Sequence, residues 1–265
     1  MTLASYLDSL PRRVAGIANL AAFLVNQLGI AIRGACGNLG RAMTKSDVLP
    51  FVAPFFLFAI FLSVEGFFPD QHYALYPLIT VLVAAAILWN WRALPSLRPS
   101  APILSAGVGL VGVVIWVGLD PFLVHYDQPL IGRNPFALYP AAVAWLLFGF
   151  RLVGIAVCVP IMEELFWRGF LMRWLIKDDF TSVPLGTYQP LSFWVTTAFF
   201  ASVHGPEWPL GLIVGLLYGA WFVRTKHLGD IMLAHGVTNL LLALYCLITN
   251  DWHFLSMVAP IPILK

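Results

Sequence analysis

The side chains of this chain that are most able to do chemistry are ionisable groups inside apolar sequence. Glu163 and Glu164 are adjacent in the stretch VCVPIMEELFWRGFL. His204 ends the stretch FWVTTAFFASVH, and His235 lies in GDIMLAHGVTNLLLALY. A charged group at the centre of a membrane helix costs about 2.5 to 3.5 kcal/mol on insertion scales, so it should persist only with partners or water. These four residues therefore mark a candidate site.

Helical spacing divides the polar residues into pairs. Glu164 and Arg168 are one turn apart with the acid on the N-terminal side, which is the favourable order for an ion pair, and we assign them a supporting role. Glu163 is turned about 100° from Glu164 around the helix axis, so this pair does not compensate it. His235 and Asn239 are also one turn apart and share a helix face.

Together these groups could perform hydrolysis in one water-filled cavity. A water between Glu163 and His204 could be deprotonated and attack a carbonyl group. His235 and Asn239 could then donate hydrogen bonds to the oxyanion that forms. A single intramembrane His or Asn often only bridges two helices, with a gain of about 0.6 kcal/mol. The whole set would be a large cost for packing alone, which favours the catalytic interpretation.

Three segments carry a family resemblance. EELFWRG at 163–169 is similar to the EExxxR motif of the CAAX-protease and bacteriocin-processing (CPBP) family of intramembrane proteases, which includes type II CAAX prenyl endopeptidases. Phe200–His204 resembles the family's FxxxH motif, and His235–Asn239 its HxxxN motif. The motifs occur in the family's order and cover roughly Arg151 to Cys246.

The resemblance implies a role for each motif residue. Glu163 resembles the base that activates water, His204 its partner, His235 and Asn239 the oxyanion-stabilising pair, and Glu164 with Arg168 the supporting residues. Two positions depart from the family's pattern: Trp167 stands where Phe is usual, and Gly236 where Ala is common. Both changes keep the chemistry but can reshape the cavity.

A finer resemblance comes from segments without derivable chemistry. GLDPF at Gly118–Phe122, RNPF at Arg133–Phe136 and the tract FWRGFLMRW resemble a bacterial branch of CAAX-protease-related proteins that is associated with exosortase sorting systems. This resemblance implies a bacterial inner (cell) membrane protein.

The composition places the candidate site in a membrane protein. Of the 265 residues, 60% are hydrophobic and 11% are charged, whereas a soluble domain has about 25% charged residues. The 15 Lys and Arg residues nearly balance the 13 Asp and Glu residues, and we expect the lipid bilayer and no nucleic acid as a partner.

The hydrophobic pattern predicts an all-α, polytopic transmembrane bundle around a polar intramembrane cavity. A spanning helix needs about 20 mostly apolar residues, and continuously apolar runs favour helices over a barrel. The apolar runs cover 14–33, 50–67, 73–90, 102–119, 138–176, 191–204, 208–223 and 228–248. We predict seven membrane helices, or eight if 14–33 also spans. Gly211, Gly215 and Gly219 recur at a spacing that predicts close approach of another helix.

The distribution of Lys and Arg predicts the organisation of the longest run. Positive charges alternate from loop to loop, as expected when cytoplasmic loops are the basic ones, provided that 138–176 crosses once. We therefore expect Pro140–Phe150 to form a short interfacial helix and the true span to begin at Arg151, with a kink at Pro160.

No internal repeat or second-domain linker is visible. We expect an N-terminal membrane-associated or spanning segment over 1–47 and an integral membrane domain over 48–265, with a protease-like core over about 151–248.

Two mechanistic alternatives remain open at the sequence level. Glu163, His204 and His235 are an acceptable Zn²⁺ ligand set with an open position for water. The HExxH signature with its separate base is missing, however. Without a metal, the same residues suffice for a glutamate-type protease, and the resemblance agrees with either form.

Three functions use the same residues. The leading hypothesis is an endopeptidase that cleaves a membrane-embedded, prenylated or otherwise lipidated peptide or protein. The second is a non-catalytic scaffold or immunity protein that binds a peptide in the same cavity. The third, a proton-coupled transporter, predicts an inverted repeat, and the sequence shows none. The sequence does not identify the substrate.

Overall fold

The computed structural model describes residues 45–65, 72–123, 130–131, 134–255 and 257–258. Helices make up nearly all of these residues, which confirms the predicted all-α class. The α-helices are α3 (Lys45–Glu65), α4 (His72–Trp89), α5 (Pro102–Leu119), α6 (Pro135–Leu138), α7 (Ala141–Val153), α8 (Val159–Glu164), α9 (Met172–Trp174), α10 (Pro190–Ser202), α11 (Trp208–Thr225) and α12 (Leu228–Thr249).

Short elements connect or interrupt these helices. The π-helical segments are η4 (Gly154–Cys158) and η5 (Leu165–Leu171). The 3₁₀ turns are η2 (Trp91–Ala93), η3 (Asp120–Phe122), η6 (Phe180–Ser182), η7 (Gly205–Glu207) and η8 (His253–Leu255). β1 (Leu130–Ile131) pairs antiparallel with β2 (Met257–Val258).

Four helical stretches in the described residues are long and apolar enough to cross a membrane. They are Pro102–Phe122, Ala141–Trp174, Gly205–Thr225 and Leu228–Thr249, and the protein is an integral membrane protein. This number is lower than the seven or eight predicted. The apolar helices over Asp47–Ser63 and Tyr73–Trp89 are shorter, and α10 has 13 residues, too few to cross about 30 Å of hydrocarbon. The run 14–33 and most of the segment 1–47 lie outside the described residues.

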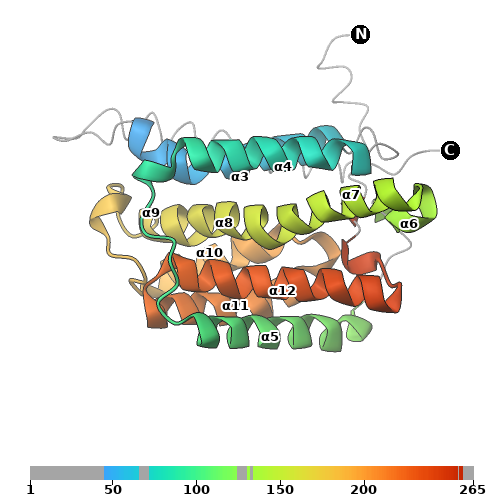
Figure 1. The fold of residues 1–265 in the computed structure, drawn as a ribbon. Coiled ribbons are helices and arrows are strands. Elements are labelled where there is room, and N and C mark those ends of the chain that lie inside the picture. The colour runs from blue at the N-terminus through green and yellow to red at the C-terminus, as the bar shows by residue number, and fades with distance from the viewer. Residues whose placement is uncertain (1–44, 66–71, 124–129, 132–133, 256, 259–265) are drawn as a thin grey trace, which may run out of the picture.

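The predicted division of the longest run at Arg151 is wrong. α7, η4, α8, η5 and α9 follow one another as a single helical segment of 34 residues, Ala141–Trp174, which we call the long helix. It lies between the α3–α4 pair and α12 (Figure 1). It remains continuous because the irregularity expected at Pro160 is absorbed by a local change in hydrogen-bond register.

That change of register is the π-helical segment η4. The backbone N–H of Val159 donates to the carbonyl of Gly154, an i→i+5 bond. In this register the carbonyl of Ile155 would pair with residue 160, which is proline and has no N–H. The side-chain Nδ2 of Asn239 on α12 donates to the Ile155 carbonyl instead, at 2.9 Å. The neighbouring helix thus completes the bond that the proline removes.

Small residues let helices approach closely around the long helix. A Cβ on Gly236 of α12 would lie 2.6 Å from the carbonyl oxygen of Ala156. On α11, a Cβ on Gly211, Gly215 or Gly219 would lie 2.7 to 3.0 Å from side chains of α10 and the turn after it. The close approach that was predicted from the glycine spacing is therefore confirmed.

Polar contacts fix α5 against α12. The buried carboxylate of Asp230 accepts hydrogen bonds from the backbone N–H of Ala101 at 2.8 Å and the hydroxyl of Ser105 at 3.0 Å, and it also accepts one from Ser100. A side chain of one helix thereby satisfies the exposed N-terminal backbone of another. Further along, the hydroxyl of Thr238 donates to the Gly109 carbonyl at 2.8 Å.

The end of the long helix is tied to the loop that follows it. Arg173 donates to the carbonyls of Gly169, Val183 and Thr181. In this loop the hydroxyl of Thr181 donates to Asp179 at 2.7 Å, and this bond is the main reason that the pKa of Asp179 is lowered from its ordinary value. The loop leads directly into α10.

Candidate active site

The first motif places a carboxylate at the centre of a buried polar cluster. Glu164 is fully buried, and its Oε1 lies 3.1 Å from Nη1 of Arg168 and 3.0 Å from Nδ1 of His235. The pair with Arg168 is the one predicted from the helical spacing. Because a carboxylate paired with arginine is an acceptor, His235 donates from Nδ1, which leaves Nε2 as the other ring position.

Arg168 connects this cluster to two further helices. Its side chain is 1% exposed. Nη2 donates to the backbone carbonyl of Gly215 on α11 at 3.3 Å, and the guanidinium carbon lies 4.4 Å from the centre of the Phe200 ring on α10. The carboxylate, the carbonyl and the aromatic ring together hold the Arg168 guanidinium in one orientation.

Phe200, the first residue of the FxxxH motif, contacts residues of all three motifs. Besides its contact with Arg168, its ring centroid lies 4.7 Å from that of His204 and 6.1 Å from that of His235. The three motifs, which are far apart in the sequence, are therefore brought together by α10, α12 and the long helix.

His204 is held in a defined ring orientation. Its Nδ1 lies 2.7 Å from the backbone carbonyl of Phe200, and a carbonyl only accepts, so the proton is assigned to Nδ1. The Trp116 ring lies 5.5 Å away, and Gly211 leaves room for the imidazole, because a Cβ there would lie 3.0 Å from it. In this neutral tautomer Nε2 carries the lone pair that can accept a proton.

Glu163 differs from its neighbour Glu164. Its side chain is half-buried, and within the described part of the chain no hydrogen bond to its carboxylate is found. Its Oε2 atom is buried without a partner. A buried acceptor in that state needs an explanation such as a bound water or substrate. Both acids keep a buried Oε2 without a partner among the described residues, but only Glu164 is bound through its other oxygen, to Arg168 and His235.

Asn239 lies on the same helix as His235 but contacts another part of the site. Its Nδ2 donates to Ile155 in the long helix, so this N–H, which was expected to face an oxyanion, anchors α12 to the π-helical segment. Of the six predicted site residues, His235, Glu164 and Arg168 form one bonded group and His204 joins them through Phe200.

Residues 136–241 match the family model described as type II CAAX prenyl endopeptidase Rce1-like. The resemblance that the motifs predicted is confirmed over this segment. The matched segment runs from α6 into α12 and contains all three motifs. No curated protein and no solved structure matches the chain significantly.

Two residues beside the CAAX-protease motifs were missed by sequence reasoning. The Tyr218 hydroxyl on α11 donates to Oγ1 of Thr238 at 2.7 Å, and the Tyr218 ring centroid lies 5.3 Å from that of His235. Both residues are buried and hold the His235 side of the cluster. The available signal was weak: Thr238 is a polar residue inside the HxxxN motif, and Tyr218 precedes one of the spaced glycines.

The Zn²⁺ set of Glu163, His204 and His235 does not fit the arrangement observed. Among the residues that the structure describes, no group of three or more His, Cys, Asp or Glu side chains is placed to hold a metal ion. Nδ1 of His235 is engaged by Glu164 and Nδ1 of His204 by a backbone carbonyl, which leaves Nε2 of each ring as the free position.

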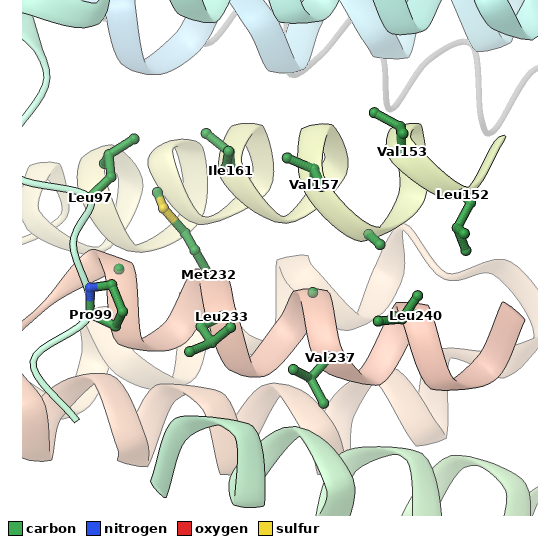
Figure 2. A pocket seen from close by; sticks show the side chains of 13 residues that line it. Leu97, Pro99, Leu152, Val153, Val157, Ile161, Met232, Leu233, Val237 and Leu240 are labelled. Atoms are coloured by element: carbon green, nitrogen blue, oxygen red, sulfur yellow. The ribbon is translucent and has the colours of Figure 1, made fainter. Parts of the chain in front are cut away.

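A cavity of about 510 Å³ lies between the long helix and α12, beside the polar cluster. Its lining is apolar: Leu97, Pro99, Leu152, Val153, Ala156, Val157, Ile161, Gly229, Met232, Leu233, Gly236, Val237 and Leu240 (Figure 2). None of the six predicted site residues lines it. In place of the predicted polar cavity, the described chain thus has a buried polar cluster on one side of α12 and an apolar cavity on another.

Proposed function

We propose that the protein is an intramembrane endopeptidase of the glutamate type, in which Glu163 and His204 activate a water. One observation carries the proposal. The three CAAX-protease motifs converge on one buried cluster in which Oε1 of Glu164 is bound by Arg168 and His235, whereas no hydrogen bond to the Glu163 carboxylate is found within the described residues. A carboxylate without a bonded partner, on the helix that carries this cluster, is the kind of base that general-base hydrolysis uses.

The proposed reaction begins with a water between the two activating side chains. The water donates one hydrogen to the Glu163 carboxylate and the other to Nε2 of His204. Glu163 takes a proton as the water oxygen attacks the carbonyl carbon of the scissile bond. The same proton then passes to the leaving amine as the C–N bond breaks, so that Glu163 returns to its ionised state.

His235 is assigned to the oxyanion in this proposal. With Nδ1–H bound to the Glu164 carboxylate, the ring is oriented, and in the imidazolium form Nε2 also carries an N–H. That N–H then donates to the developing oxyanion. Asn239 contributes by anchoring α12 to the long helix and does not meet the oxyanion directly.

The substrate is proposed to be a membrane-embedded or lipidated peptide or protein, prenylated ones included, in the bacterial inner membrane. The apolar cavity between the long helix and α12, the two helices that carry the first and third motifs, supports this class, because it has a volume of about 510 Å³ and an apolar lining, and such cavities bind apolar ligands. The terminal sequence of the substrate is left to experiment.

The decisive experiment compares new protein termini in membranes of cells that produce the wild type, Glu163→Gln or Glu207→Gln. Glu163→Gln keeps the shape of the side chain but removes the base. We expect it to lower the yield of cleaved peptides at least about 100-fold, the lower range for loss of a general base. Glu207 lies on η7 outside the three motifs, and Glu207→Gln should cleave as the wild type does.

Three outcomes would contradict parts of this proposal. Full cleavage by Glu163→Gln would remove the mechanism. Peptide binding that survives Glu163→Gln, together with an absence of cleaved products in the wild type, would support the scaffold or immunity alternative. Stoichiometric zinc in active protein, with loss of activity on chelation, would replace the glutamate type with a metal-dependent one.

A further inference from the structure

A second buried polar atom without a partner lies one turn from Glu163. The Trp167 side chain is 4% exposed, and its indole Nε1 has no hydrogen-bond partner within the described residues. Indole nitrogen can only donate. Glu163 Oε2, which can only accept when ionised, is also buried and unpartnered. An unmatched donor and an unmatched acceptor therefore occur on the same helix face.

The helix geometry brings these two side chains into one row. Residues four apart are neighbours on a helix surface, and the bond between Glu164 and Arg168 shows that such pairs meet across the junction of α8 and η5. The row formed by Glu163 and Trp167 runs directly beside that pair. Glu164 also has a buried oxygen without a partner, but its own neighbour one turn later is Arg168.

The indole ring is fixed by packing next to the motif residues. Its centroid lies 4.7 Å from that of Phe166, 5.2 Å from Phe55 and 6.3 Å from Phe200, each in an edge-to-face arrangement. Phe200 is the ring that contacts Arg168, His204 and His235. Trp167 is therefore held at the edge of the candidate site.

Packing alone does not account for a nitrogen at this position. An unsatisfied buried donor costs about 1 to 3 kcal/mol, and the surrounding lipid offers it no water. A phenylalanine would make similar edge-to-face contacts without that cost. The N–H is thus explained by a partner in the site.

We propose that Trp167 is a further catalytic residue, whose indole N–H donates to the attacking water. This inference rests on the proposed function. The water then donates its two hydrogens to Glu163 and to Nε2 of His204, and accepts one from Trp167. Its remaining lone pair is directed at the substrate carbonyl. The N–H fixes the water and stays on the indole throughout, so the proton balance of hydrolysis is unchanged.

The first test is kinetic, with a quenched fluorescent peptide copied from the cleaved segment found by the comparison of termini. Trp167→Phe should lower kcat about tenfold, the equivalent of one modest hydrogen bond, with KM within about twofold. Trp174→Phe is the matched control, because Trp174 lies on the same helix and stacks on Phe170 without an unpartnered buried nitrogen. Equal kcat in Trp167→Phe and the wild type would overturn the proposal.

The second test detects the hydrogen bond of the Trp167 indole by NMR and does not require an active enzyme. In protein labelled with ¹⁵N-tryptophan, the indole resonance of Trp167 is assigned by its loss in Trp167→Phe. We expect this resonance to move in Glu163→Leu, which removes the carboxylate that holds the water to which the indole donates, while the Trp174 resonance stays in place. A Trp167 resonance that moves in Thr196→Val but not in Glu163→Leu would assign the N–H to the buried Thr196 hydroxyl and overturn the proposal. If the resonance moves as expected but the wild type cleaves nothing, the proposed function fails and the catalytic role fails with it.

Discussion

Two of the three buried arginines of the long helix, Arg151 and Arg168, are stabilised in different ways. Arg151 and Arg168 are 5% and 1% exposed, and their guanidinium carbons lie 4.2 and 4.4 Å from the centres of the Tyr76 and Phe200 rings. Arg168 also has a carboxylate partner, Glu164. Arg151 donates from Nη2 to the Leu255 carbonyl at 2.8 Å, and its Nε and Nη1 have no partner among the described residues.

The two arginines therefore have different roles: Arg168 belongs to the candidate site, and Arg151 connects two parts of the fold. At Arg168 the charge is neutralised, and the neutralising acid also holds His235, so removing either partner disturbs the motif residues. At Arg151 the charge holds the C-terminal turn η8 against the long helix through one carbonyl. The same residue type is thus part of a preorganised cluster at one position, whereas at the other it contacts one aromatic ring and one backbone carbonyl.

The largest effect is expected when Arg168 is replaced. Arg168→Leu leaves the buried Glu164 carboxylate without its cation, which costs about 3 to 5 kcal/mol for a broken buried pair, and cleavage should be lost. Unfolding in mixed micelles measures the stability. The double variant Glu164→Leu/Arg168→Leu should recover most of the stability but not the cleavage, because neither charge of the pair remains. A double variant as unstable as Arg168→Leu would show that the pair does more than neutralise charge.

An intermediate effect tests the anchor between α12 and the long helix. Asn239→Ala leaves the Ile155 carbonyl without its donor, and we expect a loss of about 1 kcal/mol, within the range for hydrogen bonds between membrane helices. The loss should be smaller than that of Arg168→Leu in the same unfolding assay. Thr249→Ala provides a control, because the exposed Thr249 hydroxyl bonds only backbone groups at the end of α12, the Tyr245 carbonyl and the Asp251 N–H, and no other helix. An Asn239→Ala protein as stable as the control would remove the anchoring role.

The smallest effect is expected when Arg151 is replaced. Arg151→Met keeps much of the side-chain volume and removes a buried charge that has no carboxylate partner. Replacement of buried ionic groups by apolar ones is often neutral or stabilising, so we expect a change within about 0.5 kcal/mol and unimpaired cleavage. A destabilisation comparable to that of Arg168→Leu would contradict the distinction between the two arginines.

The sequence predicted the candidate site better than it predicted the helices. The motif residues could be found because charged groups are scarce, at 11% of the chain, and the Glu164–Arg168 pair followed from spacing on one helix. The bond from His235 to Glu164 could not be predicted, because it joins residues 71 positions apart and depends on how α12 packs. Helical spacing already separated the two acids, and the fold adds that Glu164 also bonds His235.

The errors in the helices have the same origin. Pro160 and the length of the run predicted a division near Arg151, but the missing proline N–H is compensated by Asn239, 84 positions from Ile155. No local pattern contains that information. The number of spans was overestimated because an apolar run does not show where a helix ends. α10 stops at Ser202 with 13 residues, although the apolar sequence continues to His204.

The π-helical segment η4 makes chain length at this point as important as residue identity. A π-helical turn accommodates one residue more than an α-helical turn, so the whole segment behaves as a fixed insertion. If the five residues 154–158 were regular α-helix instead, everything that follows would be turned by about one residue, roughly 100°. Glu163, Glu164 and Arg168 would then face different neighbours, although the span would remain equally hydrophobic. The direction in which the site residues face is therefore set by the π-helical turn η4, which ends more than one helical turn before Glu163.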